Sequence, residues 1–254
     1  MIKERIYGPT KSLVGLDVLG QMMICPGCYH GMARKVICEV LDEMDIAGKA
    51  IALPGIGCHS SLSWLMKVDS IIYAHGPAPT VATGVKRVLG DKAMVFTLQG
   101  DGDCAAIGAG YLVGAAARAE KITIFMLNNA LYGTTGGQLA PTTLMGQWTT
   151  TTPYNRDPSS GYPLHVPELM ATIKGVAYSA RGACATPAQY RKTKKYVKMA
   201  FQKQIDMVGL SFVEILVTCP THWRKTPAEA VKWVGKETIK EYPLGVFKNV
   251  DKIE

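Results

Sequence analysis

The chain has 254 residues, 48% hydrophobic and 19% charged, which is typical of a globular protein with one large core. It has no apolar run of about 18 residues that would span a membrane, and residues 1–5 lack the apolar core of a signal peptide, so we expect a cytoplasmic protein that does not enter membranes. The net charge of +8 fits either an ordinary solvated surface or attraction to an acidic partner, and the scattered Lys and Arg residues argue against nucleic acid.

Hydrophobic patterns predict helices that alternate with strands after an N-terminal arm, residues 1–23. The segments with helical patterns are, in chain order, 31–44, 60–66, 80–89, 105–119, 166–173, the basic segment 187–203 and the last helix at 226–240. The segments with strand patterns are 49–53, 70–73, 94–98, 122–127, 175–181 and the last strand at 212–218. This alternation implies a single α/β domain over residues 1–254, with a doubly wound, mainly parallel sheet.

Two further segments are expected to serve contacts rather than the sheet. Residues 133–162 form a polar stretch rich in Thr, Gly and Pro. Structureless segments of about this length in compact domains are usually functional or bound to a partner. The C-terminal part, from about residue 226 to 254, is expected to dock on another subunit through the tail at 242–245.

Two polar motifs end neighbouring predicted strands. Gly-Asp-Gly at 100–102 ends one strand, Asn-Asn at 128–129 ends the next, and 25 residues separate them. Because ligands gather at the carboxyl ends of parallel strands, Asp101 and Asn129 are expected at one sheet edge. A carboxylate and an amide oxygen suit Mg²⁺, which keeps phosphate oxygens in its other positions. The glycines let backbone N–H groups approach a diphosphate, and the following helix presents its N-terminus to that charge.

The chain contains seven cysteines, an odd number, and this argues against a disulfide framework. Cys38, Cys104 and Cys184 lie among small or apolar residues, so we expect them to be buried packing thiols. The other four cysteines lie at turns or predicted strand ends: Cys25, Cys28, Cys58 and Cys219.

These four cysteines are candidate metal ligands. The Cys-Pro-Gly-Cys run at 25–28 places two thiols on one tight turn, and Cys58 and Cys219 each follow a strand. Four thiols from separate strand ends can converge at one edge of a sheet. The residues alone leave three alternatives open: a zinc site, an iron–sulfur cluster and a redox-active dithiol.

The combined motifs resemble those of a known family. Gly-Asp-Gly, the gap of this length and Asn-Asn resemble the thiamine diphosphate (ThDP) signature. The continuation Leu-Tyr-Gly-Thr-Thr-Gly-Gly-Gln at 131–138 is similar to that of the 2-oxoacid:ferredoxin oxidoreductases. The positions of Cys25, Cys28, Cys58 and Cys219 resemble the [4Fe–4S] ligands of their β subunit. The matching segments span roughly residues 20–225 and imply the ThDP-binding fold of the diphosphate-binding type.

The resemblance assigns a role to each candidate residue. It implies that the side chains of Asp101 and Asn129 and the carbonyl of Leu131 bind Mg²⁺, and that His75 lies near the thiazolium or the substrate carboxylate; a histidine satisfied by backbone groups is the alternative for His75. The four cysteines would hold the cluster, with His59 and His222 beside two of them. The residues expected to contact the diphosphate or to order its loop are Gly100, Gly102, Asp103, Thr134 and Gly136.

The resemblance also implies the reaction and its partners. The activity would be oxidative decarboxylation of a 2-oxoacid to an acyl-CoA, with electrons passing through the cluster to ferredoxin, as in anaerobic metabolism. The Cys-Pro-Thr-x-Trp stretch at 219–223 resembles the 2-oxoglutarate and branched-chain 2-oxoacid members. No carboxylate matches the glutamate that activates the aminopyrimidine. We therefore expect it to come from a pyrimidine-binding α subunit, in a complex with γ and ferredoxin-like δ subunits, and we expect the isolated chain to be inactive.

Two other functions remain as alternatives. A non-redox ThDP-dependent lyase subunit would need no converging thiols and would be colourless. A zinc-stabilised scaffold subunit would bind zinc tightly and carry no ThDP. Iron and zinc analysis separates both from the oxidoreductase.

Overall fold

The computed structural model describes residues 24–253, so the N-terminal arm expected at 1–23 lies outside the described residues. In the described part, seven strands form one sheet in the order β2-β1-β3-β4-β6-β5-β7. All neighbouring strands run parallel except β7, which is antiparallel to β5. The strands are β1 (Ala50–Pro54), β2 (Asp69–Ser70), β3 (Met94–Gly100), β4 (Thr123–Asn128), β5 (Val176–Ala183), β6 (Leu210–Leu216) and β7 (Gly245–Asn249).

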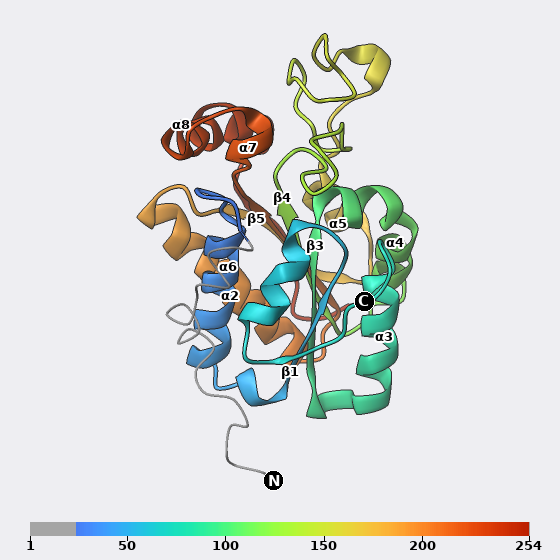
Figure 1. Ribbon diagram of the computed structural model, residues 1–254. Helices are drawn as coiled ribbons and strands as arrows, with labels where there is room; N and C mark the ends of the chain where they lie inside the picture. Colours follow the sequence, from blue (N-terminus) through green and yellow to red (C-terminus); the bar gives the residue numbers. More distant parts are fainter. Residues whose placement is uncertain (1–23, 254) are drawn as a thin grey trace.

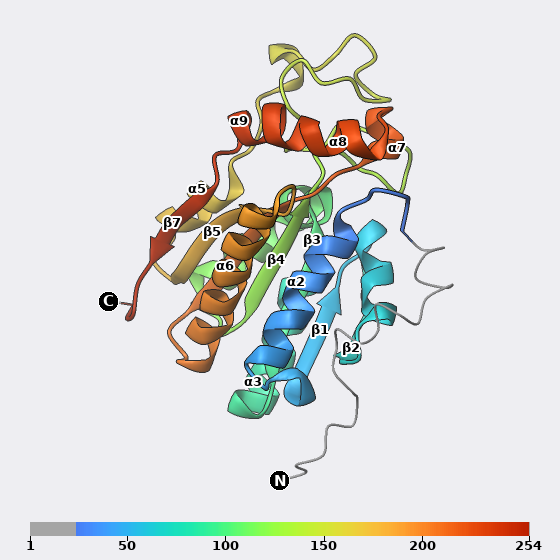
Figure 2. The ribbon, with the colours of Figure 1, turned by 90° about the vertical axis from the view of Figure 1, so that its left-hand side faces the viewer.

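Helices cover both faces of the sheet (Figures 1 and 2). Helices α2 (His30–Glu43) and α6 (Pro187–Ile205) pack on one face. Helices α3 (Ala78–Leu89), α4 (Ala109–Ala117) and α5 (Val166–Thr172) pack on the other. The central strands are buried on both sides, which explains why their sequences are continuously apolar rather than alternating.

Shorter helical segments connect and cap these layers. A row of C-terminal helices, α7 (Pro220–Trp223), α8 (Pro227–Trp233) and α9 (Ile239–Glu241), lies across the end of the sheet in Figure 2. The remaining short helices are η2 (Ala47–Lys49), η3 (Cys58–Leu65), η4 (Gly90–Lys92), η5 (Asp103–Ile107), η6 (Pro158–Ser160) and η7 (Val234–Thr238).

Local sequence explains where the long basic helix begins. Thr186 is the N-cap of α6, and its side chain accepts a hydrogen bond from the backbone N–H of Gln189. The Gln189 side chain in turn accepts a hydrogen bond from the Thr186 backbone N–H, and Pro187 fills the first helical position, where no N–H is needed. The buried face of α6 carries Val197 and Phe201, and the Phe201 ring packs against Phe96 and Phe125 of the sheet in T-shaped, edge-to-face contacts.

The strand register brings the two polar motifs to one edge. Gly100 pairs with Leu127, and Asn128 pairs with Leu216, so β3, β4 and β6 end at the same level. Pro54 of β1 pairs with Leu98, which places the turn after β1 beside them. The residues that follow each strand therefore meet at the carboxyl edge of the sheet.

The doubly wound, mainly parallel sheet expected from the sequence is confirmed. Three local expectations were wrong. The helix expected at 60–66 is the 3₁₀ segment η3, and the strand expected at 70–73 is only the two-residue β2. The strand expected to be last is followed by β7, because residues 245–249 pair with the free edge of β5.

The C-terminal tail packs on this chain. Tyr242 is fully buried, and its hydroxyl donates to the carbonyl of Thr142 at 2.6 Å. Tyr242 therefore anchors the tail within this chain, and docking of the more exposed residues of the C-terminal part on another subunit stays a prediction. No helix of residues 24–253 is long and apolar enough to cross a membrane.

Candidate active site

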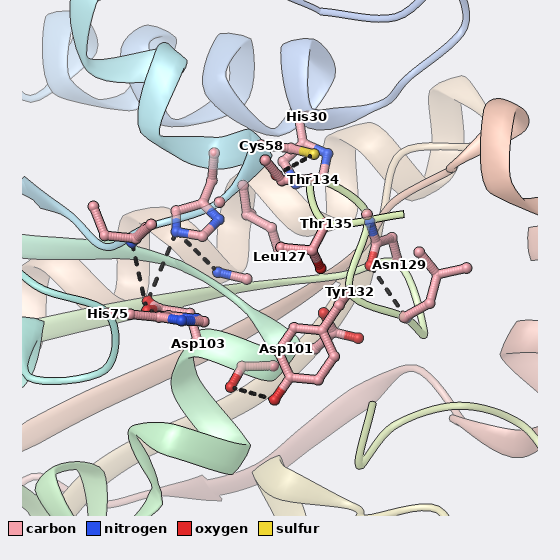
Figure 3. A pocket seen from close by; sticks show the side chains of 17 residues that line it. His30, Cys58, His75, Asp101, Asp103, Leu127, Asn129, Tyr132, Thr134 and Thr135 are labelled. Atoms are coloured by element: carbon pink, nitrogen blue, oxygen red, sulfur yellow. Dashed lines mark hydrogen bonds and ion pairs between the residues drawn. The ribbon is translucent and has the colours of Figure 1, made fainter. Parts of the chain in front are cut away.

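Two adjoining cavities lie at the carboxyl edge of the sheet. The first, here called the Gly-Asp-Gly cavity, is shown in Figure 3; the second, the cysteine cavity, opens beside it toward α7. The residues that line both are His30, Gly57, Cys58, Asn129, Gly133 and Thr134. Ligands held in the two cavities would therefore be separated by single side chains.

The Gly-Asp-Gly cavity gathers almost all the residues expected to bind the cofactor. Gly136 is the exception, because it lies in a turn at φ +119° beyond the lining residues. The expected residues that do line the cavity are His75, Gly100, Asp101, Gly102, Asp103, Asn129, Leu131 and Thr134.

Asp101 is one of two buried carboxylates that line this cavity. It is 2% exposed, and its Oδ2 accepts a hydrogen bond from the hydroxyl of Thr142. Burial raises its pKa to about 7, although the hydrogen bond from Thr142 acts in the opposite direction. A bound cation would favour the charged form of such a carboxylate.

Asn129 reaches from the end of β4 toward Asp101. One terminal atom of its amide lies 3.3 Å from Asp101 Oδ1 and 2.6 Å from the carbonyl oxygen of Leu131. If this atom is nitrogen, it donates to both oxygens. If it is oxygen, three oxygens face one another, an arrangement that a hard cation stabilises. Either way, the three groups expected to bind Mg²⁺ converge.

Asp103 lies two residues further on and has a different environment. Its Oδ1 accepts from the backbone N–H of Gly76 at 2.8 Å, and its Oδ2 accepts from Gln99 Nε2 at 2.8 Å. His59 Nε2 lies 3.7 Å from Oδ2. Burial raises the pKa of Asp103, but the hydrogen bonds from His59, Gln99 and Gly76 outweigh it and lower the pKa below its ordinary value.

His75 lies at the mouth of the cavity. Its Nε2 is 3.4 Å from Asp103 Oδ1, and 35% of its side chain is exposed (Figure 3). The Tyr132 ring meets it edge to face, with centroids 6.3 Å apart. His75 therefore has a carboxylate partner and an open face, as a residue that contacts substrate needs.

The cysteine cavity is lined by all four cysteines that the sequence singled out, and also by His222. The backbone N–H of Cys28 donates to the carbonyl of Cys25 at 2.9 Å, and this hydrogen bond closes a tight turn. The Thr218 hydroxyl donates to the carbonyl of Gly27 and accepts from the N–H of Tyr29. These bonds attach the Cys25–Cys28 turn to the end of β6, next to Cys219.

The thiols of this cavity are buried and influence one another. Burial raises the pKa of both Cys28 and Cys219 to about 12, and repulsion among the neighbouring thiolates adds to the rise. Burial also raises the pKa of Cys58, whose Sγ lies 2.9 Å from Thr134 Oγ1. Such thiols ionise at neutral pH only beside a positive centre, so this donor set suits a bound iron or zinc centre.

The four thiols of the cysteine cavity come from three segments of the chain: the Cys25–Cys28 turn, Cys58 after β1 and Cys219 after β6. Among residues 24–253, no group of three or more His, Cys, Asp or Glu side chains is close enough to hold a single metal ion.

Charge balance constrains what the Gly-Asp-Gly cavity can bind. Of the described residues that line either cavity, none is Lys or Arg. A diphosphate would therefore need a bound cation and backbone N–H groups to balance its charge. The oxygen groups of Asp101, Asn129 and Leu131 are placed to hold that cation.

Comparison with known proteins agrees with this geometry. Residues 55–215 match the family described as thiamine pyrophosphate enzyme, C-terminal TPP binding domain. The chain is 40% identical over 226 residues to the ketoisovalerate oxidoreductase subunit VorA of Methanothermobacter thermautotrophicus, covering 89% of this chain and 47% of that protein. It is 34% identical over 226 residues to the 2-oxoglutarate synthase subunit KorB of Methanocaldococcus jannaschii, covering 85% of this chain and 78% of KorB.

A solved structure shows the same fold. A 2-oxoglutarate:ferredoxin oxidoreductase from Magnetococcus marinus, with 2-oxoglutarate, coenzyme A and succinyl-CoA bound, matches with a TM-score of 0.70 and 25% identity. The match covers 89% of this chain and 80% of that chain. The protein is thus built on a thiamine pyrophosphate-binding domain. It belongs to the family of ThDP-binding subunits of 2-oxoacid:ferredoxin oxidoreductases, although it spans only about half the length of the VorA relatives it matches.

Sequence reasoning missed two residues of the site. Thr142 contacts Asp101, but nothing in the sequence distinguishes it from the other threonines of segment 133–162. Tyr132 fills the space over Gly102, since a Cβ at Gly102 would lie 2.1 Å from Tyr132 Cε1. Its position within the run at 131–138 was a usable signal.

Proposed function

We propose that this chain is the ThDP- and [4Fe–4S]-binding subunit of a complex that oxidatively decarboxylates a 2-oxoacid to an acyl-CoA and reduces ferredoxin. The supporting observation is that an oxygen donor set and a four-thiol set line adjoining cavities at one sheet edge. The relatives named for ketoisovalerate and 2-oxoglutarate support a branched-chain 2-oxoacid or 2-oxoglutarate as substrate.

The residues of the chain fit Mg²⁺, ThDP and the cluster in specific ways. Asp101, Asn129 and the carbonyl of Leu131 would hold Mg²⁺, and the Gly102 turn would give a diphosphate close access to backbone N–H groups. When bound, ThDP supplies the carbanion chemistry that releases carbon dioxide, and the cluster accepts single electrons. Cys25, Cys28, Cys58 and Cys219 would hold that cluster.

Other residues orient and shield the reacting groups. His75, supported by Asp103, would face the substrate at the cavity mouth and hold a proton at Nε2 or donate it to a substrate oxygen. Cys58 and Thr134 lie between the two cavities and would keep water from the path between the cofactors. The glutamate that activates the aminopyrimidine would come from an α subunit, because none of the described lining residues is Glu.

Cysteine substitution in the assembled complex tests the cluster. Cys25 and Cys219 line only the cysteine cavity, so Cys25→Ala or Cys219→Ala should remove iron and the visible iron–sulfur absorption while ThDP stays bound. Ferredoxin reduction should fall to background, because the electrons would have no acceptor. Cys38→Ala, a buried thiol on the α2 face, is the matched control and should keep its iron.

The outcome also decides between the alternatives. An iron-free, colourless wild-type complex that binds ThDP would favour a non-redox lyase. Tight zinc without ThDP would favour a scaffold subunit. A complex purified without oxygen and assayed with coenzyme A and a panel of branched-chain, aryl and dicarboxylic 2-oxoacids then identifies the substrate.

A further inference from the structure

Two consecutive threonines connect the long loop to the ends of both central strands. Thr142 and Thr143 are fully buried, with 0% exposure, within segment 133–162. Their neighbours Ala140 and Leu144 are also buried, so the segment passes through the molecule here instead of over its surface. A buried hydroxyl must find a partner, and both threonines find theirs at the candidate metal site.

The two hydroxyls hold opposite sides of that site. Thr142 Oγ1 donates to Asp101 Oδ2, just after β3. Thr143 Oγ1 donates to the carbonyl of Ala130, just after β4, at 2.7 Å, and accepts from the N–H of Ala140 at 2.9 Å. One dipeptide therefore bridges the Gly-Asp-Gly motif and the Asn-Asn motif.

The bond from Thr142 decides which oxygen of Asp101 is free. Since Oδ2 is occupied by Thr142, Oδ1 is left facing Asn129 at 3.3 Å. The hydrogen bond also prevents rotation of the carboxylate about its Cβ–Cγ bond. Asp101 thus presents a single oxygen in a fixed direction.

The bond from Thr143 fixes the turn that carries Asn129. Ala130 has a left-handed backbone, φ 59°, which is uncommon for a residue with a Cβ. Its N–H donates to Asn128 Oδ1 at 2.8 Å, and its carbonyl accepts from Thr143. Both polar backbone groups of Ala130 are therefore held, and this holds the neighbouring amide of Asn129 and carbonyl of Leu131.

The threonines are themselves anchored from behind. The Tyr242 hydroxyl donates to the carbonyl of Thr142 at 2.6 Å, and Tyr242 is fully buried. Arg156 Nη1 donates to the carbonyls of Pro141 and Thr143. The loop at this point is a rigid support because its carbonyls as well as its hydroxyls are bonded.

We propose that Thr142 and Thr143 act together as a clamp that sets the separation and orientation of the two metal-binding motifs, Asp101 on one side and the 128–131 turn on the other. They are positioning residues, and the inference rests on the proposed Mg²⁺–ThDP site. Loss of either hydroxyl should weaken cation binding even where the fold is intact, because the ligands would no longer be preorganised.

The test compares isosteric and conservative variants in the assembled complex, stripped of metal. Thr142→Val removes the hydroxyl and keeps the shape, whereas Thr142→Ser keeps the hydroxyl. Mg²⁺-dependent ThDP binding is measured by calorimetry, and Mn²⁺ in place of Mg²⁺ reports the ligand geometry by electron paramagnetic resonance. Thr142→Val should weaken Mg²⁺ binding roughly 10- to 100-fold, the loss expected for a hydrogen bond to a charged group. Thr142→Ser should restore most of it.

Thr143→Val should weaken binding in the same way, with a smaller effect of about 3- to 10-fold, because its partner is a neutral carbonyl. Thr149→Val is the matched control. Thr149 is equally buried in the same segment, but its hydroxyl bonds Thr152 at 2.6 Å, away from both motifs. The Mg²⁺ affinity and the Mn²⁺ spectrum of Thr149→Val should match those of the wild type.

The possible outcomes separate the clamp from the function on which it rests. If the wild type binds Mg²⁺ and ThDP and Thr142→Val binds them equally well, the clamp is refuted and the proposed function stands. If the wild type binds neither, the proposed function fails first. Should Thr142→Val not fold, Thr142→Ala is the deciding variant, because it adds no atoms to the site, and wild-type affinity in that variant would also refute the clamp.

Discussion

At the scale of single residues, surroundings give two aspartates of one motif different properties. Asp101 is buried with one hydroxyl donor, and its pKa rises to about 7. Asp103 is equally buried but accepts hydrogen bonds from Gly76 and Gln99 and lies 3.7 Å from the His59 ring, and its pKa falls. Asp101 is therefore suited to meet a cation, whereas Asp103 is charged without one and ties together the turns that surround the cavity.

The space at Gly102 gives a prediction at this scale. A Cβ there would lie 2.1 Å from Tyr132 Cε1, so Gly102→Ala must displace the Tyr132 ring that contacts His75. We expect ThDP binding to weaken roughly 5- to 150-fold, because overpacking costs about 1–3 kcal/mol. The measurement is ThDP binding at saturating Mg²⁺.

Gly110→Ala is the control for that substitution. A Cβ at Gly110 in α4 would meet nothing within 4 Å, so this variant should bind ThDP normally and gain about 0.5–1 kcal/mol in free energy of unfolding. Equal ThDP affinity in the two variants would contradict the steric argument.

At the scale of elements, a buried network of ion pairs, Arg181, Glu214 and Glu168, joins α5, β5 and β6. Arg181 of β5 is fully buried and donates to Glu214 of β6 at 2.5 Å and to Glu168 of α5 at 2.6 Å. Glu214 also accepts from Asn128 Nδ2, and Asn128 in turn bonds the Ala130 N–H. The ion-pair network thus connects helix α5 with the turn that carries Asn129.

Glu168, at the exposed end of this ion-pair network, gives a prediction about the pH dependence of stability. Glu168 is 34% exposed, and although burial raises its pKa, the hydrogen bonds and charge of Arg181 lower the pKa below its ordinary value. A carboxylate with a lowered pKa stabilises the fold above its unfolded pKa, and this contribution is lost as the pH falls through the folded pKa. At pH 7, the free energy of unfolding of the wild type should therefore exceed that of Glu168→Gln by about 1 kcal/mol, a value that already allows for solvent screening.

That stability difference should stay constant from pH 7 down to about 4.5 and then shrink as the medium becomes more acidic. Denaturant unfolding of both proteins between pH 3 and pH 7 measures it. Glu229→Gln, at an exposed capping box in α8, is a control for a carboxylate outside the ion-pair network. A difference that grows toward acidic pH would contradict the assignment.

At the scale of the whole molecule, three exposed apolar side chains line the cavity or lie just before His75 in the sequence. Ile56 is 41% exposed, Ile72 is 41% exposed and Tyr73 is 57% exposed. Ile56 lines the cavity, and residues 71–73 lead directly to His75. Exposed apolar patches can mark a surface that another protein covers, and under the proposed function a pyrimidine-binding subunit would approach this side of the cavity to complete a ThDP site.

We therefore expect the isolated chain to be inactive and Tyr73→Asp to weaken its assembly with a pyrimidine-binding subunit by roughly tenfold or more, the effect of losing an interface anchor. Sedimentation of the mixed subunits measures assembly. Val88→Asp, on α3 and 84% exposed, is the control and should assemble normally. Equal assembly of Tyr73→Asp and the wild type would place the interface elsewhere.

Much of the fold and site could be predicted from the sequence, and the failures have a common cause. The apolar runs at 94–98 and 122–127 are strands, because they are buried on both faces and need no information from distant residues. The run at 70–73 is apolar but lies at the sheet edge, where only two residues pair. Gly136 belongs to the Thr-Gly-Gly-Gln run and lies outside the cavity lining, so its expected role in ordering the diphosphate loop stays a prediction.

The sequence by itself determined the chemistry of the strand ends: Asp101, Asn129, Cys58 and Cys219 follow local apolar runs, and Cys25 and Cys28 share one tight turn. Only the tertiary structure decided what supports them. Thr142 meets Asp101 across 41 residues of sequence, and Tyr242 meets Thr142 across 100. Strand ends are specified by neighbours along the chain, whereas these contacts depend on how the loop and the C-terminal segment pack, and no local pattern encodes that packing.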